Sequence, residues 1–211
     1  MPSTDLKSEF KADQKEFWEH RYQQNETHWN IGKEHPLLPK LVSVLERLTP
    51  ALKGGTVLVP GAGHGHCAAF WANSGYPTTA ADFAPSAIKE AKKLYGKAPN
   101  LRIQQQDIFQ PQNQTYAIIY DRAMLCALPP QRRQDYCNAI SSLIRSGGVF
   151  ALISFLDIRR EGGPPWQINV MELHRLLAPN FSLMYAEDIT YEKKKDDQII
   201  FGESLTLWLR Q

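Results

Sequence analysis

A glycine-rich turn is the part of this sequence that most clearly points to a bound ligand. Gly61, Gly63 and Gly65 follow an apolar run at residues 56–59, and the run at residues 68–72 after them suits a helix. Glycine permits positive φ and a close approach of the backbone to a ligand, and the start of a helix offers unpaired N–H groups at the positive end of its dipole. The turn is therefore suited to a carboxylate or a phosphate.

Asp82 narrows the class of ligand because it stands about 20 residues after the first glycine, where a doubly wound sheet places a carboxylate against ribose hydroxyls. It ends a second apolar run at residues 76–81. A dinucleotide fingerprint requires Gly or Ala at the sixth position of the turn, which is His66 here. The two signals therefore favour S-adenosylmethionine (SAM) over a nicotinamide or flavin cofactor. The alternative is a glycine turn and a surface carboxylate in an α/β protein without a cofactor.

His64, His66 and Cys67 carry side chains of the kind that bind transition metals. A closed zinc site needs four ligands, and the sequence offers no fourth ligand at a useful spacing, so we expect no metal. The chain also lacks a Gly-x-Ser-x-Gly elbow, and its cysteines have no evident base, which leaves a hydrolase without support.

The elements that position these residues are apolar runs, which we interpret as strands, and the segments of helical periodicity that alternate with them. The alternation predicts a Rossmann-like, doubly wound α/β fold with a mostly parallel sheet, whose ligand lies at the carboxyl ends of the strands. Asp82, Asp107 and Asp121 all stand at such ends. The predicted strands are residues 56–59, 76–81, 101–105, 116–120 and, after a glycine turn at 147–148, 149–155; the predicted helices are residues 36–52, 68–72, 85–95, 129–144 and 170–178.

Two further runs, residues 182–191 and 199–209, are separated only by a charged turn at residues 193–197. So short a connection leaves no room for a crossover helix, and the two runs should form an antiparallel hairpin at one edge of the sheet. The turn contains both Lys and Asp and is expected to be solvated.

Residues 1–35 are predicted to form a helical N-terminal arm or lid, and residues 36–211 the main domain. The charged segment up to residue 21 has Phe10, Phe17 and Trp18 as its apolar points, which predicts a helix packed on the domain. Trp29 falls in an expected loop and has two interpretations of about equal weight: it pins the arm to the core, or it covers a ligand.

Composition is that of a globular chain with one α/β domain: 211 residues, 43% hydrophobic and 22% charged. The net charge of +2 is too small to indicate a nucleic acid or an anionic membrane as partner. The cysteines, Cys67, Cys126 and Cys137, are odd in number and are not spaced like the ligands of a metal site. No signal peptide or membrane span is apparent. We therefore expect a cytoplasmic monomer with free thiols and a small-molecule partner.

Three segments together resemble the thiopurine S-methyltransferase family, a branch of the class I SAM-dependent methyltransferases that includes thiol and halide methyltransferases. They are the glycine turn at residues 57–65 with Asp82, Asp-Arg-Ala-Met-Leu-Cys-Ala-Leu at 121–128, and Gly-Gly-Pro-Pro-Trp at 162–166. The glycine turn is common to all class I methyltransferases, whereas the other two segments are far more specific. The resemblance runs from about Phe17 to the C-terminus.

This resemblance implies a seven-stranded sheet in which the last hairpin is inserted antiparallel. It also implies roles for residues around SAM, whose expected product is S-adenosylhomocysteine. Gly61 and Gly63 would face the methionine portion, Asp82 would take the ribose hydroxyls, Asp107 and Ile108 would flank the adenine, and Trp29 would lie over the cofactor. Asp121 is assigned to the cofactor site as well.

Arg122 resembles the arginine that thiopurine-type members place beside cofactor and acceptor, whereas Pro-Gly-Ala-Gly at residues 60–63 is closer to the thiol and halide branch. Methyl transfer from a sulfonium is an in-line displacement that needs no metal or strong acid. For a thiol acceptor, a guanidinium favours the reactive thiolate, so Arg122 is the expected catalytic and acceptor-binding residue. Its alternative role is as an ion-pair partner of a carboxylate, either Asp121, Asp107 or that of the cofactor.

Aromatic side chains are expected to roof this site and exclude water. Trp29 and Trp166 are the candidates, with Pro165 and Trp166 assigned to the acceptor side, while Trp18 is expected to be a packing residue. The predicted activity is therefore methyl transfer to a thiol or thiopurine sulfur. The alternatives are a halide or selenium/tellurium-compound methyltransferase, an NAD-dependent oxidoreductase and a non-catalytic SAM-binding protein.

Overall fold

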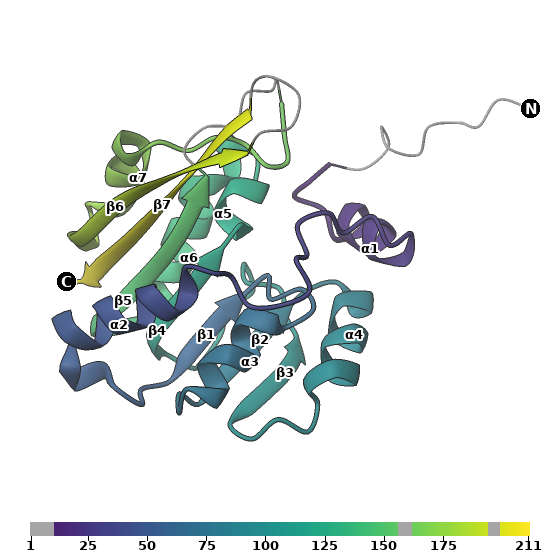
Figure 1. The fold of residues 1–211 in the computed structure, drawn as a ribbon, viewed down its shortest axis with the longest axis horizontal. Helices are drawn as coiled ribbons and strands as arrows, with labels where there is room; N and C mark the ends of the chain where they lie inside the picture. Colours follow the sequence, from purple (N-terminus) through teal and green to yellow (C-terminus); the bar gives the residue numbers. More distant parts are fainter. Residues whose placement is uncertain (1–10, 156–161, 194–198) are drawn as a thin grey trace, which may run out of the picture.

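The structure is a computed structural model that describes residues 11–155, 162–193 and 199–211, without the side chains of residues 190–193 and 199–201 (Figure 1). Phe10 and, apart from Lys193, the charged turn predicted at residues 193–197 lie outside the described residues.

Seven strands form one sheet in the order β3-β2-β1-β4-β5-β7-β6 (Figure 1). The strands β1 to β5 pair in parallel, and β7 is antiparallel to both β5 and β6. The predicted doubly wound fold with a C-terminal antiparallel hairpin is therefore confirmed. The bounds are β1 Val57–Pro60, β2 Thr78–Asp82, β3 Leu101–Gln105, β4 Tyr116–Arg122, β5 Ile144–Phe155, β6 Phe181–Lys193 and β7 Ile199–Arg210.

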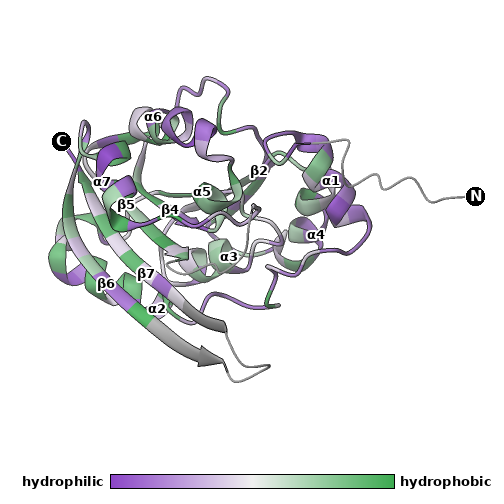
Figure 2. Ribbon diagram, turned by 90° about the horizontal axis from the view of Figure 1, so that it is seen from above, coloured by the Kyte–Doolittle hydropathy of each residue, from purple (hydrophilic) through white to green (hydrophobic). Residues whose placement is uncertain are grey.

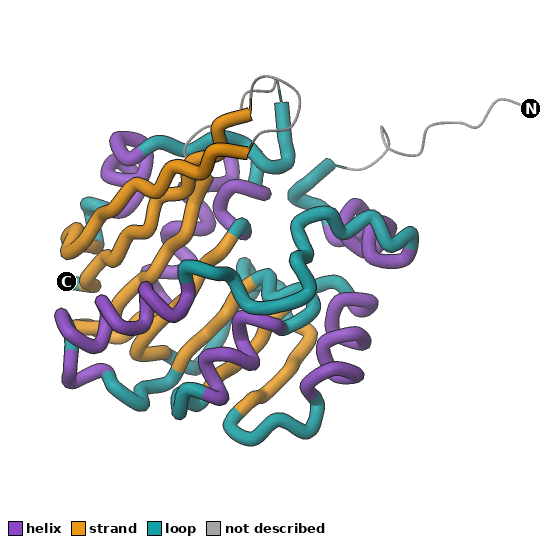
Figure 3. Tube along the Cα trace, in the orientation of Figure 1, coloured by secondary structure: helices purple, strands orange, loops and turns teal. Residues whose placement is uncertain are grey.

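Helices cover both faces of this sheet (Figure 3). One core lies under α2 (Leu38–Leu48) and α3 (His66–Asn73). A second core lies under α5 (Met124–Ala127), α6 (Arg133–Leu143) and α7 (Val170–Leu177). Residues of one strand alternate between the two cores, as the side-chain period of two requires, and Figure 2 shows hydrophobic positions along β5 and β7.

Three segments differ from the prediction. The glycine pair predicted as a turn lies inside β5, in an irregular stretch between the pairs Ile144–Tyr116 and Val149–Ile118. The helix predicted from residue 129 begins only at Arg133, after the 3-10 turn Pro130–Arg132. The helix α5 was not predicted, because four residues are too few to show a helical period.

The N-terminal arm contains α1 (Lys15–Gln23), the helix that the charged segment predicted, and α1 packs beside α4 (Pro85–Tyr95) at the end of the sheet that carries β3 (Figure 1). Most residues of α1 are hydrophilic, with apolar positions between them (Figure 2). From its C-terminal end the chain crosses the carboxyl ends of the parallel strands before it enters α2 (Figure 1). Among the helices of the described residues, none is long and apolar enough to span a bilayer.

Candidate functional site

A cavity of about 390 Å³ lies at the carboxyl ends of the parallel strands, between the sheet and the N-terminal arm. Its walls come from the arm, the glycine turn, the ends of β2 and β4, the segment 106–109 and the loop 162–166. All of the predicted site residues line it except Asp121 and Trp166. Those that do are Trp29, Gly61, Gly63, Asp82, Asp107, Ile108, Arg122 and Pro165.

The glycine turn adopts the left-handed backbone that its sequence predicted, with φ of 57° at Gly61, 54° at Gly63 and 83° at Gly65. A Cβ at Gly61 would lie 2.8 Å from the Met124 sulfur, and a Cβ at Gly63 would lie 3.0 Å from the Tyr22 hydroxyl oxygen. The glycines are therefore required by the packing of the turn itself and leave its backbone exposed to the cavity.

Asp82 supports this turn at the tip of β2. Its Oδ2 accepts a hydrogen bond from the Gly63 N–H (2.9 Å) and its Oδ1 accepts one from the Ala84 N–H (3.0 Å). Burial raises the pKa of this carboxyl to about 6, although backbone hydrogen bonds oppose the rise. A carboxylate has more lone pairs than these two bonds use, so Asp82 can still accept hydrogen bonds from a ligand in the cavity.

The segment after β3 forms the next part of the wall. Asp107 turns the chain, because its Oδ1 accepts a hydrogen bond from the Phe109 N–H (2.9 Å). Ile108 is buried and packs in the second core, and Phe109 lines the cavity under the guanidinium of Arg132, which lies 4.7 Å from the ring centroid. This wall combines the apolar side chains of Ile108 and Phe109 with the polar groups of Gln106 and Asp107, a combination that suits a purine ring.

Arg122 extends from the end of β4 toward the arm. Its Nη1 donates a hydrogen bond to the main-chain carbonyl of Trp29 (3.0 Å). The Trp29 ring meets the rings of Trp18 and Tyr22 edge to face, with centroids 5.2 and 5.7 Å apart. Trp29 thus both pins the arm and lines the cavity, so the two interpretations of this residue are compatible. Trp18, expected to be a packing residue, also lines the cavity.

Asp121 is not brought to the cavity, because adjacent residues of a strand face opposite sides of the sheet. Its carboxylate is fully buried and accepts hydrogen bonds from the N–H groups of Met124 (2.9 Å) and Leu125 (3.1 Å) and from the Tyr136 hydroxyl (2.8 Å). Burial raises the pKa of Asp121 to about 6. These contacts hold the start of α5, and they give Asp121 a structural position rather than one against a ligand.

Trp166 also lies outside the lining of the cavity. Its N–H donates a hydrogen bond to the carbonyl of Cys126 (2.7 Å), and its ring covers Gly163 so closely that a Cβ there would overlap the indole. The prolines of the same loop, Pro164 and Pro165, face the cavity instead. Trp166 therefore fixes the shape of the loop that carries them.

Two residues of α1 that were not predicted, Arg21 and Tyr22, line the cavity, and Glu19 of the same helix holds α4 outside the cavity lining. Tyr22 lies over Gly63, where burial and the nearby Asp82 raise the pKa of its hydroxyl. Glu19 accepts hydrogen bonds from the Ser86 N–H (3.0 Å) and hydroxyl (2.6 Å). It thereby caps the start of α4, whose own N-cap residue Ala84 makes no side-chain capping bond. The spacing of four residues between Trp18 and Tyr22 places both on one helix face and is the signal that could have identified Tyr22.

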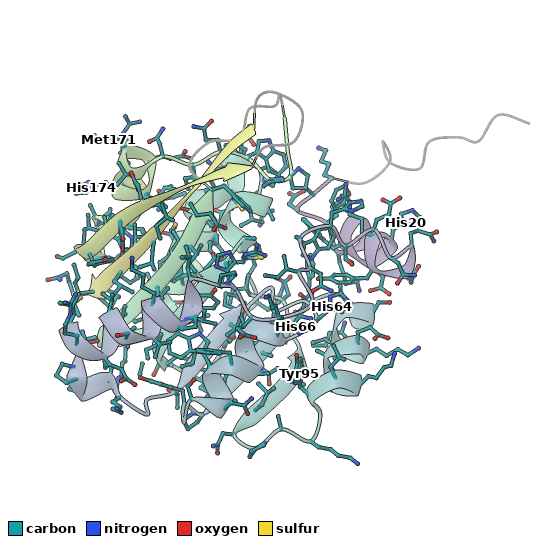
Figure 4. The ribbon with its side chains drawn as sticks, in the orientation of Figure 1. His20, His64, His66, Tyr95, Met171 and His174 are labelled. Carbon is teal, nitrogen blue, oxygen red and sulfur yellow. The ribbon has the colours of Figure 1, made fainter. Side chains whose placement is uncertain are left out.

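His64 and His66 lie beside each other below α1, with Tyr95 next to His66 (Figure 4). The Nδ1 of His66 lies 2.6 Å from the Tyr95 hydroxyl, and His64 meets the ring of Tyr22. Burial lowers the pKa of both imidazoles, which favours their neutral form. Within the described part of the chain, no three His, Cys, Asp or Glu side chains are grouped as metal ligands.

Comparison with known proteins gives a consistent match. A family model described as thiopurine S-methyltransferase matches residues 13–210. Probable thiol methyltransferase 2 of Arabidopsis thaliana is 28% identical over 167 residues, which cover 77% of this chain and 71% of the relative. Thiopurine S-methyltransferase of Vibrio campbellii is 27% identical over 183 residues, which cover 76% of this chain and 80% of the relative.

Solved structures share the fold. The 1,6-didemethyltoxoflavin-N1-methyltransferase of Burkholderia thailandensis, solved with S-adenosylhomocysteine, superposes with a TM-score of 0.71 at 17% identity. The superposition covers 100% of this chain and 92% of that one. At this identity the likeness concerns the fold alone.

Proposed function

The chain belongs to the thiopurine S-methyltransferase family, and from this membership we propose that it transfers the methyl group of SAM to the sulfur of a small thiol or thiopurine. As a member of this family it is a SAM-dependent methyltransferase, so the alternative of an NAD-dependent oxidoreductase is wrong. The observation that supports a sulfur acceptor is the guanidinium of Arg122 in the cavity that also contains the glycine turn and Asp82.

The residues of the cavity fit SAM. Asp82 is a buried carboxylate with unused acceptor capacity beside a turn whose glycines leave the backbone open. We assign the ribose hydroxyls to Asp82, the methionine portion to Gly61 and Gly63, and the adenine to the wall formed by Asp107 and Ile108. Tyr22 and Trp29 would cover the cofactor from the arm.

Bound SAM supplies a methyl group on a positively charged sulfur, which a soft nucleophile displaces in line. The protein's part is to align the two reactants, to exclude water and to keep the acceptor sulfur ionised. The apolar and aromatic lining supports the exclusion of water; it includes Trp18, Trp29, Phe109, Met124, Leu128, Phe155 and Pro165.

Arg122 is proposed to bind the acceptor as its thiolate. A guanidinium remains protonated at all accessible pH values, and a positive charge beside a thiol lowers the pKa of that thiol. The bond from Nη1 to the Trp29 carbonyl uses only one of the five N–H groups of the guanidinium. The remaining polar face can therefore hold an anionic sulfur while the arm stays in place.

Proton transfer to a side chain is not required by this scheme, and three titratable side chains of the cavity are held by other protein groups. Asp107 holds the Phe109 N–H, and His66 is bonded to the Tyr95 hydroxyl. His35 has its Nε2 3.1 Å from Glu203 Oε1, and its Nδ1 accepts a hydrogen bond from a main-chain N–H. We infer that the acceptor thiol loses its proton to solvent before the transfer, because of its own acidity and the nearby charge of Arg122.

The arm is proposed to act as a lid over both ligands. Three of its contacts link it to the main domain at or beside the site: Glu19 on the start of α4, Tyr22 on the glycine turn and Trp29 on Arg122. Closure of the arm would bring the aromatic rings over the cofactor and complete the environment of Arg122 in one movement.

A small soft anion is the second candidate acceptor, because the same guanidinium suits it and because Thiocyanate methyltransferase 1 of Arabidopsis thaliana is 27% identical over 167 residues. The test is calorimetric titration with SAM, followed by a transfer assay with thiols, thiopurines, thiocyanate, iodide and selenite. Methyl transfer to thiols or thiopurines is expected. Transfer to the inorganic anions alone would replace the proposal with the second candidate, and SAM binding without transfer to any of these acceptors would refute both candidates.

A further inference from the structure

We propose that Arg133, which does not line the cavity, is a positioning residue that holds the loop 162–166 against the acceptor side of the site. The consequence for kinetics rests on the proposed sulfur acceptor, whereas the consequence for the loop does not. Arg133 opens α6 and only 1% of its surface is exposed. A charge this deeply buried must be paired and hydrogen bonded, so its partners define what it does.

Those partners belong to the end of the loop, the residue after it and the first turn of α7. Nη1 of Arg133 donates to Oε1 of Glu172 in the first turn of α7 (2.6 Å). Nη2 donates to the main-chain carbonyls of Trp166 (3.3 Å) and Gln167 (3.1 Å). One planar group therefore fixes the end of the loop and the start of α7 to α6, which a flexible ammonium could not do with the same geometry.

The rest of the loop follows from the position of Trp166. With its carbonyl on Arg133, its N–H reaches the carbonyl of Cys126 in α5 (2.7 Å), and its ring folds over Gly163. Pro164 and Pro165, which lie between Gly163 and Trp166 in the chain, are thereby held at the cavity wall. Each link is a direct contact, so a change at Arg133 reaches the cavity through the loop.

The residues assigned to SAM lie on other elements, at the glycine turn, the tip of β2 and the segment 106–109. Loss of the Arg133 contacts should consequently weaken the binding of the acceptor and leave that of the cofactor unchanged. This difference distinguishes a positioning role from a general loss of stability, because a general loss of stability would lower the affinity for the acceptor and the affinity for SAM together.

The test is the variant Arg133→Lys in the full-length protein, with Arg210→Lys as matched control. Arg210 also donates to main-chain carbonyls, but its acceptors are Ser141 (3.2 Å) and Asn180 (3.0 Å), which lie outside the loop 162–166. For Arg133→Lys we expect at least a tenfold rise in KM for a bulky thiol, kcat within threefold and the Kd for SAM within twofold of wild type. Arg210→Lys should leave all three unchanged.

Amide hydrogen exchange of Trp166 gives a readout that does not depend on activity. Its exchange should be at least tenfold faster in Arg133→Lys and unchanged in Arg210→Lys, because its bond to Cys126 depends on the loop. If Arg133→Lys does not fold, the variant Gly163→Ala takes its place. This variant leaves Arg133 intact but displaces the Trp166 ring, and it should show the same rise in KM.

An unchanged Trp166 exchange rate, or a SAM affinity that falls together with acceptor affinity, would overturn the proposal for Arg133. If the wild-type enzyme methylated no thiol, the sulfur acceptor would be refuted, and the exchange rate of Trp166 would still decide whether Arg133 holds the loop.

Discussion

Replacement of Asp82 by Asn is expected to remove most of the affinity for SAM and to leave the fold intact. Asp82 is proposed to accept hydrogen bonds from the ribose hydroxyls, and a hydrogen bond to a charged group contributes about 1.5–3 kcal/mol. An amide keeps one acceptor oxygen but loses the charge. The expected loss is therefore about 2–3 kcal/mol, which corresponds to a roughly 30- to 150-fold rise in Kd.

The effect of this substitution on folding is expected to be smaller, because two changes oppose each other. The amide can accept only one of the two N–H groups that Asp82 now accepts, and an unsatisfied buried N–H costs about 1–3 kcal/mol. The rise of the Asp82 pKa from 3.8 to about 6 means that its buried charge already costs roughly 3 kcal/mol at neutral pH, and Asn removes that cost. The free energy of unfolding should therefore change by less than the free energy of SAM binding changes.

Asp121→Asn provides a matched control. Asp121 is as buried as Asp82, accepts two backbone N–H groups and has a pKa raised to the same value, but it does not line the cavity. Calorimetric titration with SAM, beside chemical unfolding of each variant, separates the two cases. An equal loss of SAM affinity in both variants, or an unchanged Kd in Asp82→Asn, would refute the assignment of Asp82 to the ribose.

Further predictions concern pH, the acceptor and the arm. SAM affinity should rise about tenfold per pH unit up to pH 6 and then level off, because binding requires the Asp82 carboxylate, and titrations of Asp82→Asn should lack this dependence. Stability should fall as pH rises from about 4 to 6, since the folded protein binds protons on Asp82 and Asp121 more tightly than the unfolded chain does; Asp121→Asn should lose its part of that slope in urea unfolding. Arg122→Met should lower kcat/KM for a thiol about 100-fold through loss of one charged contact, while the Kd for SAM stays within threefold of wild type. Arg122→Lys should recover part of the lost kcat/KM. An equal loss of kcat/KM and of SAM affinity would make Arg122 a cofactor ligand. Glu19→Gln should speed amide exchange in α1 about tenfold, because the amide can accept only one of the two bonds from Ser86 and carries no charge; unchanged exchange would show that the arm is held elsewhere.

The sequence was sufficient to predict the elements that are marked by hydrophobic periodicity and by turn residues at their ends. The strand at residues 101–105 and the helix at residues 85–95 have the bounds that were predicted, and the short connection before residue 199 correctly predicted an antiparallel hairpin. The glycine turn and Asp82 are in place because the order β1, turn, helix, β2 by itself brings them to one end of the sheet.

What the sequence could not show depends on orientation and on contacts between distant segments. Asp121 and Arg122 are neighbours that face opposite sides of β4, and only the position of the sheet decides which one meets the cavity. The arm is held at Arg122 by a main-chain carbonyl of Trp29, a group that every residue possesses and that no side-chain pattern reveals. In the loop that the sequence singled out, the prolines line the cavity while the indole of Trp166 packs on Gly163.

Methyl transfer from SAM to two thiols of different acidity, measured against pH at saturating SAM, tests the central claim most directly. If the acceptor reacts as a thiolate held by Arg122, the midpoint of kcat/KM should equal the solution pKa of each thiol. The midpoint of kcat should lie below that value and return toward it in Arg122→Met. A single midpoint shared by both thiols would instead indicate a protein base, and the absence of methylated thiol in both cases would contradict a sulfur acceptor.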